Sequence, residues 1–140
     1  SFRRIENGGA EVCHGSGGIV HICHCTICQK SNGQPAEITV LIKAGTLKYL
    51  KNELKCSVTS TTGKRGLCPE CDSRLVWQAT DPEQDWTTNL CVGSLDSPSE
   101  ARVTCHVHAD TQLPWYKVCE DLPKFTEHDV AAMMKFIKLD

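Results

Sequence analysis

The sequence has no long hydrophobic run and no large excess of charge of either sign. No stretch approaches 18 apolar residues, so no helix that spans a membrane is predicted. The formal net charge of −2 gives no basic excess of the kind that nucleic-acid binding requires. We therefore expect neither a membrane nor a nucleic acid as a partner. No apolar stretch follows the first residues, which predicts the absence of an export signal and a cytoplasmic location.

Linkers, internal repeats and low-complexity segments are also missing from the 140 residues. This length suits one hydrophobic core, and the apolar fraction of 40% is high enough for the chain to fold. We therefore expect a single domain over residues 1–140. The chain is too short for a doubly wound nucleotide-binding fold with a second domain.

Cysteine, in contrast, is abundant. The ten cysteines would permit five disulfides, but their spacing argues against a disulfide framework. The segments Cys23-His24-Cys25-Thr26-Ile27-Cys28 and Cys68-Pro69-Glu70-Cys71 each bring thiols close enough along the chain to converge on one ion. Clustered free thiols of this kind are typical of a reducing compartment.

Short β-branched segments at regular intervals predict a mainly β, mostly antiparallel domain. A hairpin is expected from residues 10–13 and 19–23, joined by the glycine-rich turn at residues 14–18. The other predicted strands are residues 38–43, 46–50, 57–61, 74–77, 86–92 and 102–108. We interpret residues 63–66 as a turn-rich approach to the second cysteine cluster.

One α-helix is predicted at the C-terminal end of the sequence. Thr126 can cap its start, with Asp129 three residues later, as in a capping box. The apolar side chains with helical spacing form one face, which we expect to pack on the sheet: Val130, Met133, Met134 and Ile137.

The first cysteine cluster has the spacing of a zinc site. In an extended strand Cys23 and Cys25 point to one face, whereas His24 points to the other and is not expected to be a ligand. A turn at residues 26–27 would bring Cys28 to the same point, with three sulfurs around one zinc. Three protein ligands and an open position are typical of a catalytic zinc, and four are typical of a structural one. The spacing leaves open whether thiols of the second cluster close the site.

The second cluster, Cys68 and Cys71, forms a C-x-x-C between a turn-rich segment and a predicted strand, as in a zinc knuckle. The alternative is a redox-active pair of the thioredoxin kind, which requires a helix rather than a strand after the motif. Two thiols do not complete a structural zinc site, and the N-terminal candidate for the partner pair is Cys13-His14. The isolated cysteines are expected in the core: Cys56, Cys91, Cys105 and Cys119.

Motifs in four regions of the chain, in order, resemble the glutathione-dependent formaldehyde-activating enzyme family, which includes centromere protein V. The residues that carry the resemblance are 23–33, 64–71, 93–98 and the C-terminal segments 106–107, 113–115 and 121–125. They extend over about residues 10–126 of the chain.

The resemblance implies a tent-like stack of antiparallel sheets built around zinc. It implies a catalytic zinc on Cys23, Cys25 and Cys28, and a second, structural zinc on Cys68 and Cys71 with an N-terminal C-x-C.

The chain departs from the family pattern at the second zinc. The N-terminal C-x-C is expected near Arg3–Ile5, and no cysteine stands there. Leu67 and Asp72 replace an aromatic residue and a glycine of the pattern. The second zinc is therefore expected to be either absent or completed by other groups, and these changes indicate a divergent member of the family.

The activity that the resemblance implies is a carbon–sulfur lyase that forms or breaks S-hydroxymethylglutathione or a related thiol adduct. His106 and His108, two residues apart in a predicted strand, are expected on one face and are candidates for handling the proton of the oxygen. Lys30 is a candidate for attracting a glutathione carboxylate; the alternative is a solvated lysine. The alternative function is a non-catalytic zinc β-module that binds a protein partner. A homo-oligomer is compatible with both functions.

Overall fold

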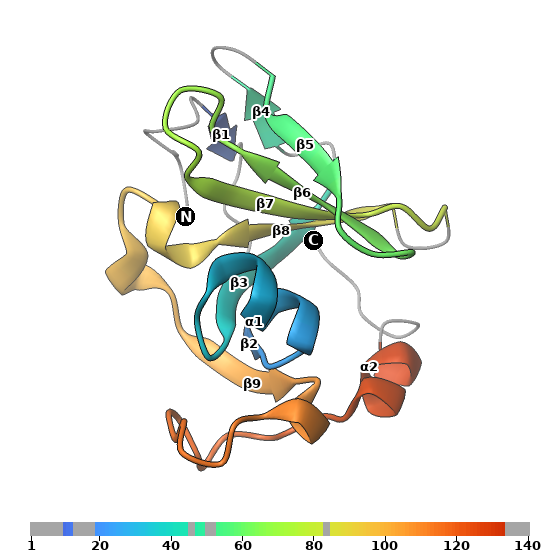
Figure 1. Cartoon of the computed structure of the whole chain (residues 1–140). Helices are drawn as coiled ribbons and strands as arrows, with labels where there is room; N and C mark the ends of the chain where they lie inside the picture. Colours follow the sequence, from blue (N-terminus) through green and yellow to red (C-terminus); the bar gives the residue numbers. More distant parts are fainter. Residues whose placement is uncertain (1–9, 13–18, 45–46, 50–52, 83–84, 134–140) are drawn as a thin grey trace.

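The computed structural model of the chain describes residues 10–12, 19–44, 47–49, 53–82 and 85–133 (Figure 1). Its strands are β1 (Ala10–Val12), β2 (Ile19–Cys23), β3 (Glu37–Lys43), β4 (Leu47–Tyr49), β5 (Lys55–Val58), β6 (Gly63–Leu67), β7 (Arg74–Ala79), β8 (Thr87–Cys91) and β9 (Val103–Val107). Its helices are α1 (Thr26–Asn32) and α2 (Glu127–Met133), with 3-10 turns η1 (Val92–Ser94), η2 (Pro98–Glu100) and η3 (Ala109–Thr111). The predicted mainly β fold is confirmed.

Seven of the strands form one mixed sheet in the order β5-β6-β7-β8-β3-β2-β9, and β1 and β4 form a separate pair. Neighbouring strands of the large sheet are antiparallel, except that β9 runs parallel to β2. The parallel pair brings the segment after β9 to the end of β2, where the first cysteine cluster begins.

The predicted hairpin of residues 10–13 and 19–23 is wrong. β1 pairs with β4, and β2 lies between β3 and β9. Val20 and Ile22 of β2 are almost fully buried, and a strand with such side chains is favoured in the interior of a sheet. The glycine-rich turn at residues 14–18 lies outside the described residues.

The hydrophobic core lies on one face of the large sheet. Val20, Val40, Leu90 and Val76 form a row across β2, β3, β8 and β7. Leu47 of β4 packs against this core, so the small sheet lies on the same face. Alternate residues of the same strands point to the opposite face, where α1 packs against β3. The large sheet therefore separates an apolar face from the face that carries the cysteine cluster.

Strand β6 was not predicted, because its two glycines suggested a turn. Both are required by close packing: a Cβ atom on Gly63 would lie 2.3 Å from Trp77 Nε1, and one on Gly66 would lie 2.6 Å from Val76 Cγ2. Glycine within a strand often marks such a close approach. The two glycines therefore allow β7 to lie against β6 with its large side chains in place.

We expect Gly63→Ala to destabilise the protein by about 1–3 kcal/mol, because the added methyl group meets the rigid Trp77 ring. The free energy of unfolding from urea titrations measures this effect. Gly93→Ala is the matched control, since no atom lies within 4 Å of its Cβ position. Its free energy of unfolding should change by no more than about 0.5 kcal/mol. Equal stability of the two variants would contradict the packing explanation.

The C-terminal helix begins as predicted. The Asp129 N–H donates to Thr126 Oγ1 at 3.3 Å, and the Thr126 N–H donates to Asp129 Oδ2 at 3.2 Å. The Glu127 N–H donates to Asp110 Oδ1 at 3.0 Å, which ties α2 to η3. Figure 1 shows α2 at the edge of the molecule, so its described part does not cover the sheet as predicted. Met134 and Ile137 lie outside the described residues.

Among the described residues, no helix has the length and apolar character required to cross a membrane.

Candidate metal centre

Three thiols converge where β2 ends and α1 begins. The Sγ atoms of Cys23, Cys25 and Cys28 all lie within 4.8 Å of one another. Cys23 is the last residue of β2, Cys25 precedes α1, and Cys28 lies in its first turn. Cys23 and Cys25 are partly exposed and Cys28 is buried. Neither Cys68 nor Cys71 belongs to this group in the described part of the chain.

Cys28 is placed by a helix and not by the simple turn that was predicted. The Cys25 sulfur caps α1 by accepting a hydrogen bond from the Cys28 N–H at 3.3 Å. Gly33 ends the helix with φ of 69°, and its N–H donates to the Gln29 carbonyl at 2.8 Å. Left-handed backbone of this kind favours glycine at a helix end. The residues between the cysteines carry no strong helical periodicity, so α1 was not predicted.

The three thiols compete for the same protons. Hydrogen bonds from the Cys23 and Cys28 thiols lower the pKa of Cys25 to about 2. The hydrogen bond with Cys25 raises the pKa of Cys23 to about 12, and hydrogen bonds with Cys23 and Cys25 also raise the pKa of Cys28. One thiolate is therefore stable, whereas three at this separation need a cation among them. A set of three sulfurs suits zinc, which binds thiolates readily.

Charged side chains lie beside the sulfur of Cys28. Arg65 Nη2 donates to Cys28 Sγ at 3.1 Å, and Glu37 Oε2 lies 3.4 Å from the same sulfur. Arg74 holds the other oxygen of Glu37 through Nε at 3.1 Å and Nη2 at 2.6 Å. Two guanidinium groups and one carboxylate leave one net positive charge here. A divalent ion on three thiolates carries one net negative charge, so the donor set and its surroundings fit zinc.

Glu37, Arg65 and Arg74 were not predicted as site residues. They come from β3, β6 and β7, and only the order of strands in the sheet brings them together. The signal available in the sequence was a charged residue, Arg65, within a short glycine-rich segment. In the folded chain Arg65 is 3% exposed, which is unusual for an arginine.

A polar row continues along this face of the sheet from the cluster. His21 Nε2 lies 3.1 Å from Thr39 Oγ1, which donates to Asn89 Oδ1 at 3.3 Å. Burial lowers the pKa of His21 to about 4, so the ring is neutral near pH 7. His21 and Cys23 point to the same face of β2, so the row lies beside the cluster.

His106 and His108 do not lie on one face of a strand as predicted. The strand ends at Val107, and His108 has φ of 51°, which turns the chain away from strand geometry. His108 is partly buried, and its electrostatic influence lowers the pKa of Cys25, after the larger effect of the hydrogen bonds with Cys23 and Cys28. Of the two, His108 therefore lies within electrostatic reach of the cluster.

His106 is fully buried in a pair with His24. His106 Nε2 lies 2.8 Å from the Cys119 carbonyl oxygen and therefore carries the hydrogen. His106 Nδ1 then accepts from His24 Nε2 at 2.7 Å. Burial lowers the pKa of His24 to about 4, which keeps this ring neutral. His24 is outside the cysteine group, as expected from strand alternation.

Cys68 and Cys71 form a tight turn before β7. The Asp72 N–H donates to the Cys68 carbonyl at 2.9 Å, and the Cys68 N–H donates to the Ser73 carbonyl at 2.8 Å. Asp72 has φ of 60°, the left-handed conformation that favours glycine. Cys68 is buried and Cys71 exposed, and the hydrogen bond with Ser73 lowers the pKa of Cys71.

The following strand agrees with a knuckle rather than a thioredoxin-like pair. Among the described residues, no third cysteine, histidine or carboxylate places a ligand atom close enough to both thiols to form a metal-binding group with them. Cys13-His14 lies outside the described residues.

The isolated cysteines differ from one another in how far they are buried. Cys105 is buried as predicted, but Cys56 and Cys119 are exposed. Cys56 lies on β5, an edge strand whose residues are all exposed. Cys91 is partly buried on the face of the cluster, where its sulfur lies 3.7 Å from Glu37 Oε1 and burial raises the pKa of Cys91 to about 12. Lys30 is exposed in the last turn of α1.

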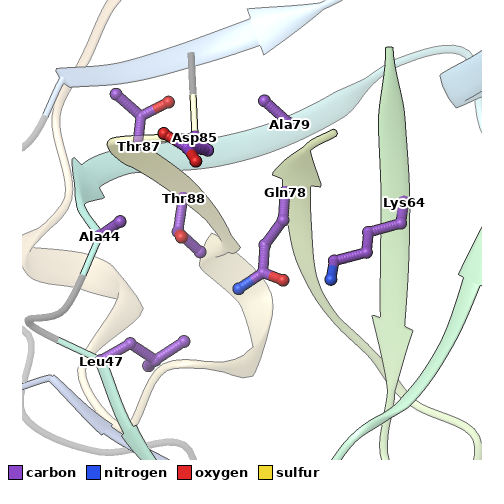
Figure 2. Close-up of a pocket in the computed structure, with 8 residues that line it drawn as sticks. All are labelled: Ala44, Leu47, Lys64, Gln78, Ala79, Asp85, Thr87 and Thr88. Carbon is purple, nitrogen blue, oxygen red and sulfur yellow. The ribbon is translucent and has the colours of Figure 1, made fainter. Parts of the chain in front are cut away.

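A pocket of about 330 Å³ lies away from the cluster (Figure 2). Lys64, Gln78 and Thr88 stand in register on β6, β7 and β8. They alternate with Arg65 and Asn89, so they point to the opposite face of the sheet. The lining residues are Ala44, Leu47, Lys64, Gln78, Ala79, Asp85, Thr87 and Thr88. This set contains none of the side chains of the candidate metal centre.

Comparison with known proteins gives one family. No curated protein matches the chain. Among solved structures, the chain is similar to a Rhodobacter sphaeroides protein, with 16% identity, a TM-score of 0.47, and coverage of 82% of this chain and 89% of that one. The model of the family described as "Glutathione-dependent formaldehyde-activating enzyme" matches residues 11–111. The match begins after Arg3–Ile5 and includes Cys13. Because it spans most of the sequence and both cysteine clusters, the chain belongs to the glutathione-dependent formaldehyde-activating enzyme family.

Proposed function

We propose that the protein is a zinc-dependent carbon–sulfur lyase that acts on an adduct of glutathione, or of another small thiol, with a small aldehyde. The observation that carries this proposal is the convergence of the Cys23, Cys25 and Cys28 sulfurs. Membership of the family supports a glutathione-related substrate. The reaction would take place in a single domain formed by residues 1–140.

Cys23, Cys25 and Cys28 would hold the zinc ion, which when bound keeps a substrate sulfur deprotonated near neutral pH. Cys28 is buried, whereas Cys23 and Cys25 are partly exposed. A substrate thiol would therefore approach from the side of Cys23 and Cys25. Lys30 is exposed on the same short helix as Cys28 and is the candidate for contact with a glutathione carboxylate.

His108 is the better candidate for the proton of the substrate oxygen. In the breakdown direction the hydroxyl of the adduct loses its proton, the carbon–oxygen double bond forms, and the sulfur leaves with the electron pair of the carbon–sulfur bond. A neutral imidazole can accept that proton and return it in the reverse direction. His106 is less suitable, because both of its ring nitrogens are engaged in buried hydrogen bonds.

The test is the rate at which zinc-loaded protein interconverts glutathione and S-hydroxymethylglutathione in the presence of formaldehyde, followed by NMR exchange spectroscopy. We expect the native chain and Cys56→Ser, which changes an exposed cysteine, to accelerate exchange equally. Cys25→Ser should give no acceleration. If the zinc-loaded chain accelerates exchange for neither glutathione nor other small thiols, the lyase proposal is wrong and the non-catalytic module takes its place.

A further inference from the structure

We propose that Arg65 is a positioning residue of the metal centre: it holds the Cys28 sulfur in place and offsets the negative charge of the three thiolates. This inference rests on the proposed function, because it assigns a role to Arg65 toward the zinc. Arg65 lies in β6, far from the cysteine cluster in the sequence, and reaches Cys28 across the sheet.

Arg65 is buried, and no carboxylate among the described residues pairs with it. Its side chain is 3% exposed, and no carboxylate of the described residues forms an ion pair with it. Nη1 donates to Thr59 Oγ1, and Nε has no hydrogen-bond partner among the described residues. A buried charge is costly unless an opposite charge is near. The group within hydrogen-bond distance that can become an anion is the Cys28 thiol, at 3.1 Å from Nη2.

An ion pair between Glu37 and Arg74 lies beside the same sulfur. Glu37 is already engaged with Arg74 through Oε1, while its Oε2 lies 3.4 Å from Cys28 Sγ. A carboxylate at this distance disfavours a thiolate, because the two like charges repel. Among the described residues, Arg65 is the cation that contacts Cys28 and counteracts this repulsion. Loss of Arg65 would therefore remove the cation that offsets the charge of Glu37 beside the Cys28 sulfur.

The hydrogen bond from Arg65 to the Cys28 sulfur is of a kind that affects metal affinity. Groups that hydrogen-bond to a metal ligand orient it and tune its basicity, and their loss typically lowers metal affinity by about 10- to 100-fold. The Cys28 sulfur also contacts Cys23 Sγ at 3.6 Å, so a shift of Cys28 changes the spacing of the whole cluster. Arg65 thus links the position of β6 to the geometry of the three sulfurs.

The experiment measures metal affinity, with Co²⁺ as the probe, through the cobalt–thiolate charge-transfer absorption. Zn²⁺ affinity is measured in parallel by competition with a chromophoric chelator. We expect Arg65→Met to lower affinity by about 10- to 100-fold and Arg65→Lys, which keeps the charge, to lower it less. Arg102→Met is the matched control, because Arg102 is exposed and donates to the Ser99 and Ala101 carbonyls. Its affinity should equal that of the native chain.

A second readout separates this role from a purely structural one. The midpoint pH of zinc release should rise in Arg65→Met, because the Cys28 thiolate loses its cation and is protonated more readily. The melting temperature of the metal-free protein should not fall, since the substitution removes a buried charge without a carboxylate partner. A lower melting temperature with unchanged affinity and release pH would instead show a structural role and overturn the inference.

The outcomes distinguish this inference from the proposed function. If the native chain shows no cobalt–thiolate absorption, the metal centre itself is wrong, and the role of Arg65 fails with it. If the native chain binds and the Arg65 variants bind equally well, the role of Arg65 is wrong while the metal centre stands. Arg65→Lys supplies the same comparison if Arg65→Met does not fold.

Discussion

We expect the replacement of Cys28 by serine to prevent zinc binding at the cysteine cluster and to abolish the proposed lyase activity. Cys28 is the buried member of the three thiols, and its sulfur lies within 3.6 Å of Cys23, Glu37 and Arg65. A hydroxyl is a poorer zinc ligand than a thiolate, and two thiols alone do not complete a site. Loss of a group that hydrogen-bonds to a metal ligand typically lowers metal affinity by about 10- to 100-fold. We expect the loss of the ligand Cys28 itself to lower zinc affinity by more than this. Chelator competition measures this affinity, and NMR exchange measures the activity.

Cys91→Ser is the matched control for this prediction. Cys91 contacts the same carboxylate as Cys28, through Glu37 Oε1 at 3.7 Å, but lies outside the three-thiol group. Its replacement should leave zinc affinity within twofold of the native value, roughly the error of such measurements. If the two variants lose zinc equally, Cys91 is a fourth ligand and the open site is wrong. If neither loses zinc, the cluster is not the metal centre.

Replacing Arg74 by methionine destabilises the metal-free protein by about 3–5 kcal/mol, because it leaves the Glu37 carboxylate buried without its cation. Glu37 is 7% exposed, so its carboxylate has little contact with water in the native chain. Arg74 also donates to the Ser31 carbonyl at 2.8 Å, which ties β7 to α1. The free energy of unfolding from denaturant titrations measures the change.

Two further variants define the physical cause of this destabilisation. Lys55→Met breaks the exposed pair with Asp72, in which both side chains are more than 60% exposed, and should cost no more than about 1 kcal/mol. Adding Glu37→Gln to Arg74→Met removes the buried charge and should recover part of the lost stability. A loss that is as small in Arg74→Met as in Lys55→Met would contradict the importance of the buried pair.

The sequence predicted the features that depend on local patterns. Short β-branched segments at regular intervals indicated most of the strands, including β3 and β8, which lie in the middle of the large sheet. The spacing of Cys23, Cys25 and Cys28 indicated that they could converge, because strand alternation and one reversal of the chain are local properties. The capping residues Thr126 and Asp129 indicated the start of α2 for the same reason.

The features that the sequence did not predict depend on contacts between distant segments. Gly63 and Gly66 suggested a turn, but they are required by the Trp77 and Val76 side chains of the neighbouring strand. The pairing of β1 with β4 has no local signal, since a glycine-rich turn favours a hairpin with the next strand.

The contacts around the cysteine cluster also depend on segments that are distant in the sequence. Arg65 and Glu37 meet Cys28 only because β6 and β3 belong to one sheet and α1 packs against β3. His106 and His108 appeared equivalent in the sequence. They differ in the structure because β9 ends at Val107 and His108 has a left-handed backbone. His106 is buried in a hydrogen-bonded pair with His24.

The most direct test of the open zinc site is the number of sulfur neighbours of zinc, measured by X-ray absorption before and after addition of glutathione. Cys71→Ser is used for this measurement, because it breaks the second cysteine pair at an exposed position. The account predicts three sulfurs at about 2.3 Å and one lighter atom, changing to four sulfurs with glutathione. Four sulfurs before addition, or three both before and after, would contradict it.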